Sequence, residues 1–336
     1  MNSSILAADI GGTNCRLGLF KLNKNKLSLD KQAWIETGSI AHTEALLAAF
    51  ERELETGHAG VDSVVVSIAG PVEDCTAGKL SNGNLEMDFG EFRSKGLDFF
   101  LINDFMAQAY AVLSPEGEKA RLIAGPKKPA RDDTRAVIGA GTGLGQATLV
   151  RLAPAGENQS GQWLAVPSEN GHSAFPFVNG MENDFHTFLR MKQKIPYSTG
   201  DNTINGSGLA YLHEFLTGEK LIPAQVGAQY LSKDTETLRW YSRMYARACR
   251  NWILSTRCDG GLWIAGGIAA QNPLTVTSEA FVNELYNSPL WEDYLRSVPI
   301  YLMEDTNSGL WGAARFGQQQ LELTPPPMKV ESAEAK

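Results

Sequence analysis

The stretch FFLINDFMAQAY, residues 99–110, contains the transition on which the predicted fold depends. Residues 99–102 are apolar and partly aromatic, which is typical of a short buried strand. Asn103 and Asp104 end this run, and the residues after them have the pattern of a helix. A polar pair at that point can simply cap the helix. It can also place the carboxylate of Asp104 at the ligand-binding rim of an open α/β sheet, where a general base would stand.

Length and composition limit the classes of protein that fit. A chain of 336 residues, 43% of them hydrophobic, is long enough for roughly two domains, each with its own core. The net charge of −8 argues against a nucleic acid or an anionic membrane as partner. No apolar run reaches the ~18 residues that a membrane-spanning helix needs.

Cysteine usage indicates a reducing compartment. The four cysteines are widely spaced and form no C-x-x-C pair, and the five histidines do not cluster with them. Reduced thiols and a cytoplasmic location are therefore expected, without a zinc site. The opening MNSSILAADIGG has no basic leader, so no signal peptide is expected.

A glycine–threonine turn, GGTN at residues 11–14, lies between two apolar stretches at 4–10 and 15–20. This arrangement predicts a hairpin whose glycines let a ligand approach the backbone. Asp9 stands just before the turn. Backbone N–H groups and a threonine hydroxyl beside a carboxylate suit a phosphate with its divalent metal. An ordinary glycine-rich hairpin is the alternative.

A second unit of the same kind, GAGTGLGQ at residues 139–146, follows about 130 residues later, again between two predicted strands. A dinucleotide-binding G-x-G-x-x-G would need a further glycine at position 144 or 146, where Leu144 and Gln146 stand. A P-loop would need a Gly-Lys-Ser/Thr sequence, and no lysine is present. The interpretation that remains is a phosphate clamp made of two such turns, one from each of two similar halves of the chain.

Three further stretches complete the pattern. In SENGH, residues 168–172, Glu169 and His172 can hydrogen-bond vicinal hydroxyls, although such a pair is also a common surface feature. Residues 262–265 predict a buried strand that runs into Gly266 and Gly267 and then a helix, which turns backbone N–H groups toward a ligand. Residues 235–256 carry an aromatic and aliphatic stripe at helical spacing, which predicts a buried helix.

In order along the chain, DIGGTN, LINDF, GAGTGLG, a Glu-x-Gly-His loop and IAGGI resemble the motifs of bacterial ATP-dependent glucokinases of the hexokinase/actin-like ATPase superfamily. The resemblance covers about residues 5–317. It implies an α/β fold of two actin-like ATPase (ribonuclease H-like) domains around a central cleft. The predicted small domain is residues 1–113, completed by a C-terminal helix at about 304–320. The predicted large domain is 114–303, and 321–336 is expected to be a flexible tail.

The resemblance also implies roles for individual residues. Asp104 would be the general base that takes the proton from the sugar 6-hydroxyl, and Asp9 would hold Mg²⁺ through water. The implied sugar ligands are Asn103, Asp104, Glu169, His172 and Asp201. The implied ATP-binding residues, besides Asp9, are Gly11, Gly12, Thr13, Asn14, Gly141, Thr142, Gly143, Gly266 and Gly267.

Two departures from the family pattern concern the choice of hexose. Asn170 stands where the family usually has a glycine, and Asp201 stands where a glutamate, one methylene longer, commonly contacts the sugar. The expected activity is ATP-dependent phosphorylation of glucose to glucose 6-phosphate, the entry to glycolysis. The alternatives are a kinase for fructose or mannose, a non-catalytic sugar sensor and an actin-like or chaperone-like ATPase. The expected partners are glucose, ATP and a second copy of the chain in a homodimer.

Overall fold

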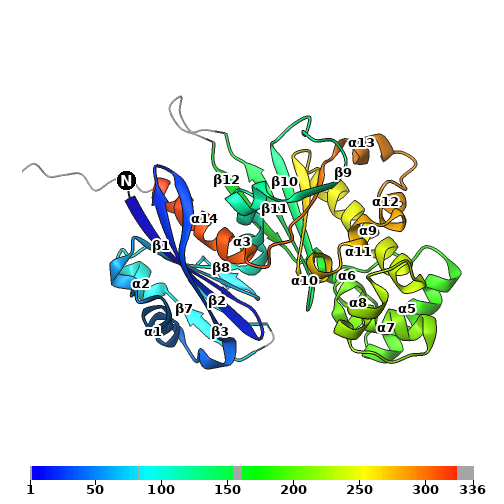
Figure 1. Cartoon of the computed structure of the whole chain (residues 1–336), viewed down its shortest axis with the longest axis horizontal. Coiled ribbons are helices and arrows are strands. Elements are labelled where there is room, and N and C mark those ends of the chain that lie inside the picture. The colour runs from blue at the N-terminus through cyan, green and yellow to red at the C-terminus, as the bar shows by residue number, and fades with distance from the viewer. Residues whose placement is uncertain (1, 82, 154–160, 324–336) are drawn as a thin grey trace, which may run out of the picture. The chain divides into compact units, whose positions relative to one another are not determined.

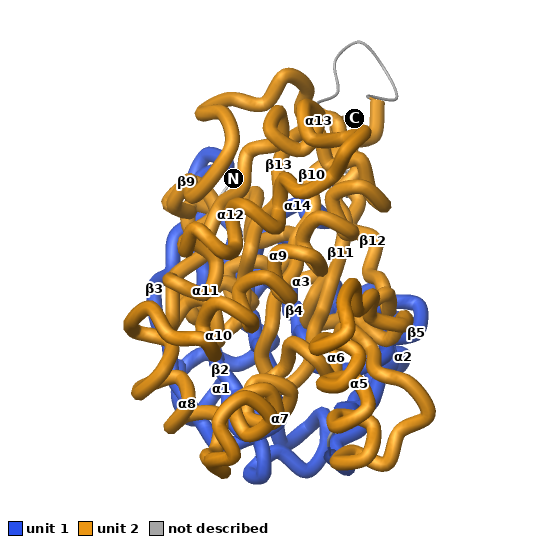
Figure 2. Tube along the Cα trace, turned by 90° about the vertical axis from the view of Figure 1, so that its right-hand side faces the viewer, with its two compact units in different colours: residues 1–102, 313–336 blue, residues 103–312 orange. Residues whose placement is uncertain are grey.

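The structure is a computed structural model that describes residues 2–81, 83–153 and 161–323. Its contacts divide the chain into two compact units, shown in Figure 2. Unit 1 comprises residues 1–102 and 313–336, and unit 2 comprises residues 103–312. The boundaries predicted from the sequence, 1–113 and 114–303, differ from this division in residues 103–113 and 304–312. Most of the predicted tail, from residue 324 on, lies outside the described residues.

Unit 1 is built on a five-stranded sheet with the strand order β3-β2-β1-β4-β8 (Figure 1). Strand β1 (Asn2–Ile10) pairs antiparallel with β2 (Asn14–Asn23), which pairs antiparallel with β3 (Lys26–Glu36). On the other side, β4 (Ser63–Ile68) runs parallel to β1, and β8 (Phe99–Asn103) forms the edge. The first glycine–threonine turn therefore joins two paired strands, as predicted.

Helices and a small second sheet cover this unit. The sheet has the order β5 (Val72–Glu73), β6 (Ala77–Lys79), β7 (Glu86–Asp88), and the helices are α1 (Thr43–Leu54), α2 (Gly90–Ser94) and the part of α14 (Ser308–Leu323) that follows residue 312. Two short 3-10 helices, Thr37–Ser39 and His58–Gly60, lie before and after α1 in the chain. Helix α1 buries Leu46, Phe50 and Leu54, which recur every four residues and so share one face.

Unit 2 repeats the strand arrangement of unit 1. Its six-stranded sheet has the order β12-β11-β10-β13-β14-β9. In β12-β11-β10-β13, the first three strands are antiparallel neighbours and the fourth is parallel to the third, as in β3-β2-β1-β4 of unit 1. The second glycine–threonine turn again joins two paired hairpin strands. The strands are β9 (Arg121–Ala124), β10 (Thr134–Ala140), β11 (Leu144–Arg151), β12 (Trp163–Ser168), β13 (Gly261–Ala265) and β14 (Ile300–Leu302).

Helices α3, α9 and α10 pack against this sheet, and α5, α7 and α8 lie side by side (Figure 1). Across the described residues, none of the helices combines the length and the apolar character required to cross a bilayer. The helices are α3 (Asp104–Ala111), α4 (Pro115–Glu118), α5 (Gly180–Gln193), α6 (Gly200–Ile204), α7 (Gly206–Thr217), α8 (Pro223–Tyr230), α9 (Glu236–Thr256), α10 (Gly267–Gln271), α11 (Leu274–Thr277), α12 (Glu279–Leu285) and α13 (Glu292–Ser297).

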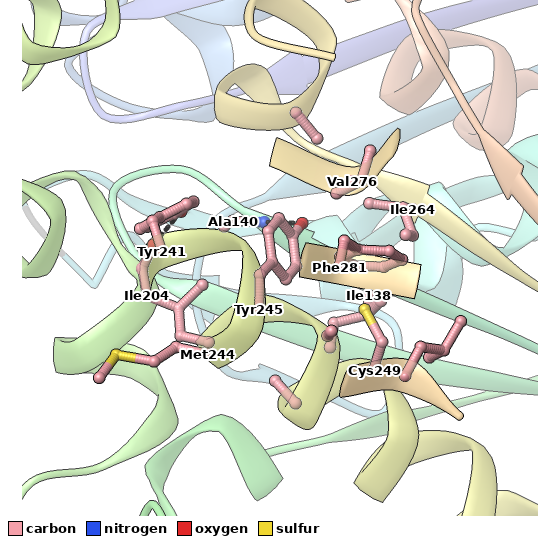
Figure 3. Packing of buried hydrophobic residues seen from close by; sticks show 14 of the residues in the cluster. Ile138, Ala140, Ile204, Tyr241, Met244, Tyr245, Cys249, Ile264, Val276 and Phe281 are labelled. Carbon is pink, nitrogen blue, oxygen red and sulfur yellow. Dashed lines mark hydrogen bonds between the residues drawn. The ribbon is translucent and has the colours of Figure 1, made fainter. Parts of the chain in front are cut away.

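Helix α9 is the core helix of unit 2, which confirms the interpretation of its aromatic stripe. Figure 3 shows Tyr241 and Tyr245 projecting from it into the buried cluster. The Tyr241 hydroxyl donates to the carbonyl of Ile204 at 2.5 Å, and the Tyr245 hydroxyl accepts the N–H of Ala140 at 3.2 Å. Burial raises the pKa of both phenols, so both keep their protons. The core is thereby tied to the ends of β10 and α6.

A buried ion network joins α9 to α5 and α12. The side chains of Arg247 and Glu182 are 1% and 2% exposed, and two guanidinium nitrogens donate to the carboxylate of Glu182 at 2.7 and 3.1 Å. The same guanidinium also donates to Glu284 at 3.1 Å and to the carbonyl of Pro176 at 2.9 Å. Removing one partner from such a buried pair leaves a charge without compensation.

We expect Glu182→Gln to lower the free energy of unfolding by about 3 kcal/mol, because Arg247 stays buried with part of its charge unpaired. Urea denaturation followed by circular dichroism measures the change. The matched control is Glu292→Gln, which removes an exposed pair to Arg296 of 2.7 Å and should cost less than about 1 kcal/mol. Equal losses in the two variants would contradict the role of the network.

The contribution of Glu182 should also depend on pH. Burial acts to raise the pKa of Glu182, but hydrogen bonds from Arg247 and the Val178 N–H outweigh it, and the pKa lies below its ordinary value of 4.5. A carboxyl whose pKa is lowered by folding stabilises the protein fully above that ordinary value and loses its contribution as the pH falls through the lower, folded-state value. The difference between wild type and Glu182→Gln should therefore shrink below pH 4.5.

Candidate active site

Asn103 and Asp104 lie at the start of α3. The Asn103 side-chain oxygen accepts the backbone N–H groups of Phe105 and Met106 at 2.9 and 3.3 Å, so Asn103 is the N-cap. Asp104 is the first helical residue and is half-buried. The capping interpretation is therefore confirmed for Asn103, and it leaves the carboxylate of Asp104 at the positive end of a helix dipole.

Phe105, the next residue, determines where this helix start lies within unit 2. Its ring covers two glycines of the β10–β11 hairpin, Gly139 and Gly145, which are paired in the register of the two strands. A Cβ atom on Gly145 would come within 1.9 Å of the ring, and one on Gly139 within 3.1 Å. Two glycines of the predicted phosphate motif thus make room for the helix that carries Asp104.

The second glycine–threonine turn, residues 141–143, is held by the segment that contains α6 and the start of α7. The N–H of Gly206 donates to the carbonyl of Gly141 at 3.0 Å, and the side-chain amide of Asn205 donates to the carbonyl of Thr142 at 3.1 Å. One carboxylate oxygen of Asp201 accepts the N–H of Leu144 at 2.7 Å. Three contacts from one segment therefore fix both ends of the turn.

A cavity of about 740 Å³ opens beside this turn, within unit 2. Such a volume is in the range of small-molecule and cofactor sites. Of the predicted ATP-binding residues in unit 2, Gly141, Thr142 and Gly267 line it. Gly266, which precedes α10, has φ +88° and lies against Ala140, so its conformation and its lack of a Cβ both favour glycine there.

Sequence reasoning missed most of the cavity wall. The additional lining residues come from α7, α8 and α10 and the segments beside them, and they are Gly206, Ser207, Leu209, Pro223, Ala224, Gly227, Ala228, Ile268, Gln271 and Asn272. Most are small or apolar, so they carry no chemical signature. Pro223 at the first position of α8 could have revealed that helix, because proline favours the first helical turn.

The loop with Glu169 and His172 packs against the same turn. Gly171 is buried so close to Leu144 that a Cβ would come within 2.1 Å of the Leu144 carbonyl oxygen. Asn170, which stands in place of the family's glycine, donates from its side chain to Gln146 at 3.1 Å. The side chains of Glu169 and His172 are 80% and 64% exposed, with 3.6 Å between Oε2 and Nε2. Both are accessible to a ligand.

In unit 1, the turn of residues 11–14 is exposed from Gly12 to Asn14. The Thr37 hydroxyl donates to the carbonyl of Gly11 at 2.8 Å and holds the turn from outside. Asp9 is buried beneath it, with one carboxylate oxygen 2.9 Å from Arg16 and the other 2.8 Å from the Ser67 hydroxyl. Asp9, the acid of this sequence motif, is therefore paired with a cationic side chain as well as with a hydroxyl.

This donor set suits a magnesium ion only through water. Among the described residues, no three His, Cys, Asp or Glu side chains come together as metal ligands. Mg²⁺ usually keeps several waters and binds one or two carboxylates together with substrate phosphates. Each oxygen of Asp9 accepts one hydrogen bond and retains a lone pair, so a metal-bound water can still donate to it.

We expect Gly145→Ala to destabilise the protein by about 1–3 kcal/mol, the usual cost of overpacking, because the new methyl group meets the ring of Phe105. Thermal unfolding measures it. The double variant with Phe105→Ala should lose less than the sum of the two single losses, since the clash is removed. Gly180→Ala, where nothing lies within 4 Å of the added Cβ, is the matched control. Additive losses would rule out the contact.

Comparisons with known proteins agree with these observations. The family model described as Glucokinase matches residues 6–320. The glucokinase of Pseudomonas paraeruginosa is 29% identical over 331 residues, covering 94% of this chain and 93% of that protein. The crystal structure of glucokinase from an Antarctic psychrotroph has a TM-score of 0.77 and 25% identity, covering 94% of this chain and 98% of that one.

The fold is shared more widely. The crystal structure of glucokinase from Balamuthia mandrillaris in complex with glucose has a TM-score of 0.72 at 18% identity, covering 95% of this chain and 94% of that one. The α/β, actin-like ATPase fold class that the five motifs predicted is thereby confirmed. Together with the family match, these likenesses establish that the chain belongs to the glucokinase family.

Proposed function

We propose that the protein transfers the γ-phosphoryl group of ATP to the 6-hydroxyl of glucose, giving glucose 6-phosphate and ADP. The observation that carries the proposal is the cavity of unit 2, which the second glycine–threonine turn lines in a chain of the glucokinase family. Phe105 connects the hairpin of that turn to the helix that begins with Asp104. A family member from Balamuthia mandrillaris was solved in complex with glucose, which supports the choice of sugar.

The nucleotide would occupy the cavity. Its adenosine would pack on the small and apolar wall near Gly266 and Gly267, and its phosphates would point toward Gly141, Thr142 and Gly143. Backbone N–H groups are suited to this task because they offer fixed dipoles without a side chain to reorganise. The turn of unit 1, Gly11, Gly12, Thr13 and Asn14, would bind phosphate oxygens in the same way.

The sugar would be recognised by hydrogen bonds from Asn103, Glu169 and His172. The resemblance also assigns a sugar contact to Asp201, which its second carboxylate oxygen would make. A site built from such groups discriminates strongly, because a sugar that lacks one hydroxyl leaves a polar group unpaired.

Phosphoryl transfer then needs a base and good alignment. As the bond between the sugar O6 and the γ-phosphorus forms, the bond from that phosphorus to the β,γ-bridging oxygen breaks, and ADP leaves. The carboxylate of Asp104 accepts the proton of the 6-hydroxyl. Little covalent chemistry is asked of the protein, so positioning and charge stabilisation supply most of the rate.

Mg²⁺ would bind together with ATP. When bound, it neutralises charge on the phosphates, and Asp9 would hold it through water, consistent with the bonds to Arg16 and Ser67.

We further propose a cytoplasmic location, because all four cysteines lie in the described residues and each is a free thiol. The predicted homodimer stays a prediction, which sedimentation equilibrium would test.

A kinase for fructose or mannose is the second candidate. The observation that favours it is Asp201, which is shorter than the family's glutamate and already holds the Leu144 N–H with one oxygen. A coupled assay of ADP release with glucose, fructose and mannose decides between the two candidates. The highest kcat/KM with glucose supports the first, and no ADP release with any hexose would exclude both.

We expect Asp104→Asn to lower kcat at least ~10²-fold, the range of lost general-base catalysis. The amide cannot take the proton, but it keeps the shape of the side chain, so the KM for glucose should change little. Steady-state kinetics with both substrates varied measures the two constants.

Glu279→Gln is the matched control for this variant. Glu279 follows the N-cap Ser278 at the start of α12, as Asp104 follows Asn103 at the start of α3. Each variant loses a carboxylate from a helix N-terminus, which costs about 0.3–1 kcal/mol of stability. Only Asp104→Asn should lose turnover. Activity within threefold of wild type would remove Asp104 from the chemistry.

We expect Glu169→Gln chiefly to raise the KM for glucose, by roughly 10-fold, because hydrogen bonds to a charged acceptor are stronger than those to an amide. The KM for ATP should stay near that of wild type. The same steady-state titrations measure both constants. A glucose KM equal to that of wild type would show that the loop does not touch the sugar.

A further inference from the structure

We propose that Asp201 is a positioning residue for the nucleotide, acting through the second glycine–threonine turn. Its carboxylate holds the backbone of that turn in the shape that receives the phosphates of ATP. The proposal rests on the proposed function for the identity of the ligand. It differs from the sugar contact that the resemblance assigns to Asp201, because it makes nucleotide affinity the property that Asp201 controls.

The contact itself is directed at the turn. Asp201 accepts the N–H of Leu144, the residue that follows Gly143 and begins β11, at 2.7 Å. Gly143 lies so close that a Cβ on it would come within 2.5 Å of the same carboxylate oxygen. The glycine therefore makes room for the acid, and the acid fixes the exit of the turn.

The segment that carries Asp201 is itself well held. The backbone N–H of Thr199 donates to the side chain of Asn202 at 2.8 Å and the Thr199 hydroxyl accepts the N–H of Asn202 at 3.2 Å, a capping box that fixes the start of α6. Tyr241 holds the end of α6 through the carbonyl of Ile204. A carboxylate on such a support restricts the turn before any ligand arrives, which lowers the entropy cost of binding.

The hydrogen bond commits one lone pair of this carboxylate oxygen to the backbone of the turn. The neighbouring contacts from Asn205 and Gly206 are directed at the same turn. Asp201 completes this set at the side of the turn where β11 begins.

The test compares Asp201→Ala, Asp201→Asn and Asp201→Glu. Calorimetry measures the Kd of a non-hydrolysable ATP analogue in the absence of sugar, and steady-state assays measure the KM for ATP and for glucose. Asp201→Ala should weaken nucleotide binding about 10- to 100-fold, the value of a hydrogen bond to a charged acceptor. Asp201→Asn should stay within about threefold, because the amide oxygen can accept the same N–H.

Asp201→Glu separates the two roles even if Asp201→Ala fails to fold. If Asp201 positions the turn, the longer side chain does not fit against Gly143, and nucleotide affinity falls. If Asp201 is primarily a sugar ligand, the longer acid leaves nucleotide affinity unchanged and lowers the KM for glucose, which would overturn the proposal. Asp184→Ala, an exposed acid of α5, is the control that should match wild type in every constant.

A double-variant cycle adds a readout that general destabilisation would not produce. Gly143→Ala pushes the carboxylate away and should weaken nucleotide binding in the wild-type background, but add little to Asp201→Ala. Full additivity would overturn the proposal. If wild type binds no nucleotide, the proposed function itself fails, whereas equal affinity of wild type and a folded Asp201→Ala refutes this inference alone.

Discussion

The packing of one aromatic ring on two glycines fixes the start of α3 against the β10–β11 hairpin of unit 2. Phe105 lies over Gly139 and Gly145, which face each other across the β10–β11 hairpin. Because a ring meets backbone atoms there without intervening side chains, the first residue of α3 has almost no freedom to shift along the hairpin. Asp104 and the turn of residues 141–143 therefore belong to one packed body. A general base has to lie at a fixed distance from the group that it deprotonates, and this contact would provide that constraint for Asp104 in the proposed mechanism.

Near this contact, buried hydrogen bonds hold backbone segments beside the second glycine–threonine turn that would otherwise be flexible. Tyr245 holds the strand just before the turn, and Tyr241 holds the helix that supplies Asp201 (Figure 3). Both phenols belong to α9, so the core helix supports both the second glycine–threonine turn and the helix that carries Asp201. The unit 1 turn is held by Thr37, whose hydroxyl donates to the carbonyl of Gly11 at 2.8 Å and whose N–H donates to the carbonyl of Thr13 at 2.9 Å. The two halves share their strand order but hold their turns through different contacts.

The sequence predicted the parts of this structure that have a strong local pattern. The apolar strands before Asn103, Gly141 and Gly266 and the long helix α9 follow from periodicity, and the five ordered motifs predicted the family. Strand β3 was not predicted, because it is an edge strand whose residues are mostly polar and exposed. The cavity wall was missed because small residues such as Gly227 and Ala228 have no signature. The contact of Asp201 with Leu144 spans 57 positions, so only the folded chain reveals it.

The buried guanidinium of Arg247 links helices that should unfold together. It bonds α5 through Glu182, α12 through Glu284 and the carbonyl of Pro176, all from the centre of α9. Separating any of these three elements from α9 would leave a buried polar or charged group without its partner, so we expect them to lose their structure together. The backbone amides of α5, α9 and α12 should then exchange with solvent as a single cooperative unit. Residues outside this network, such as the exposed Glu169 and Asn170, should exchange independently of it.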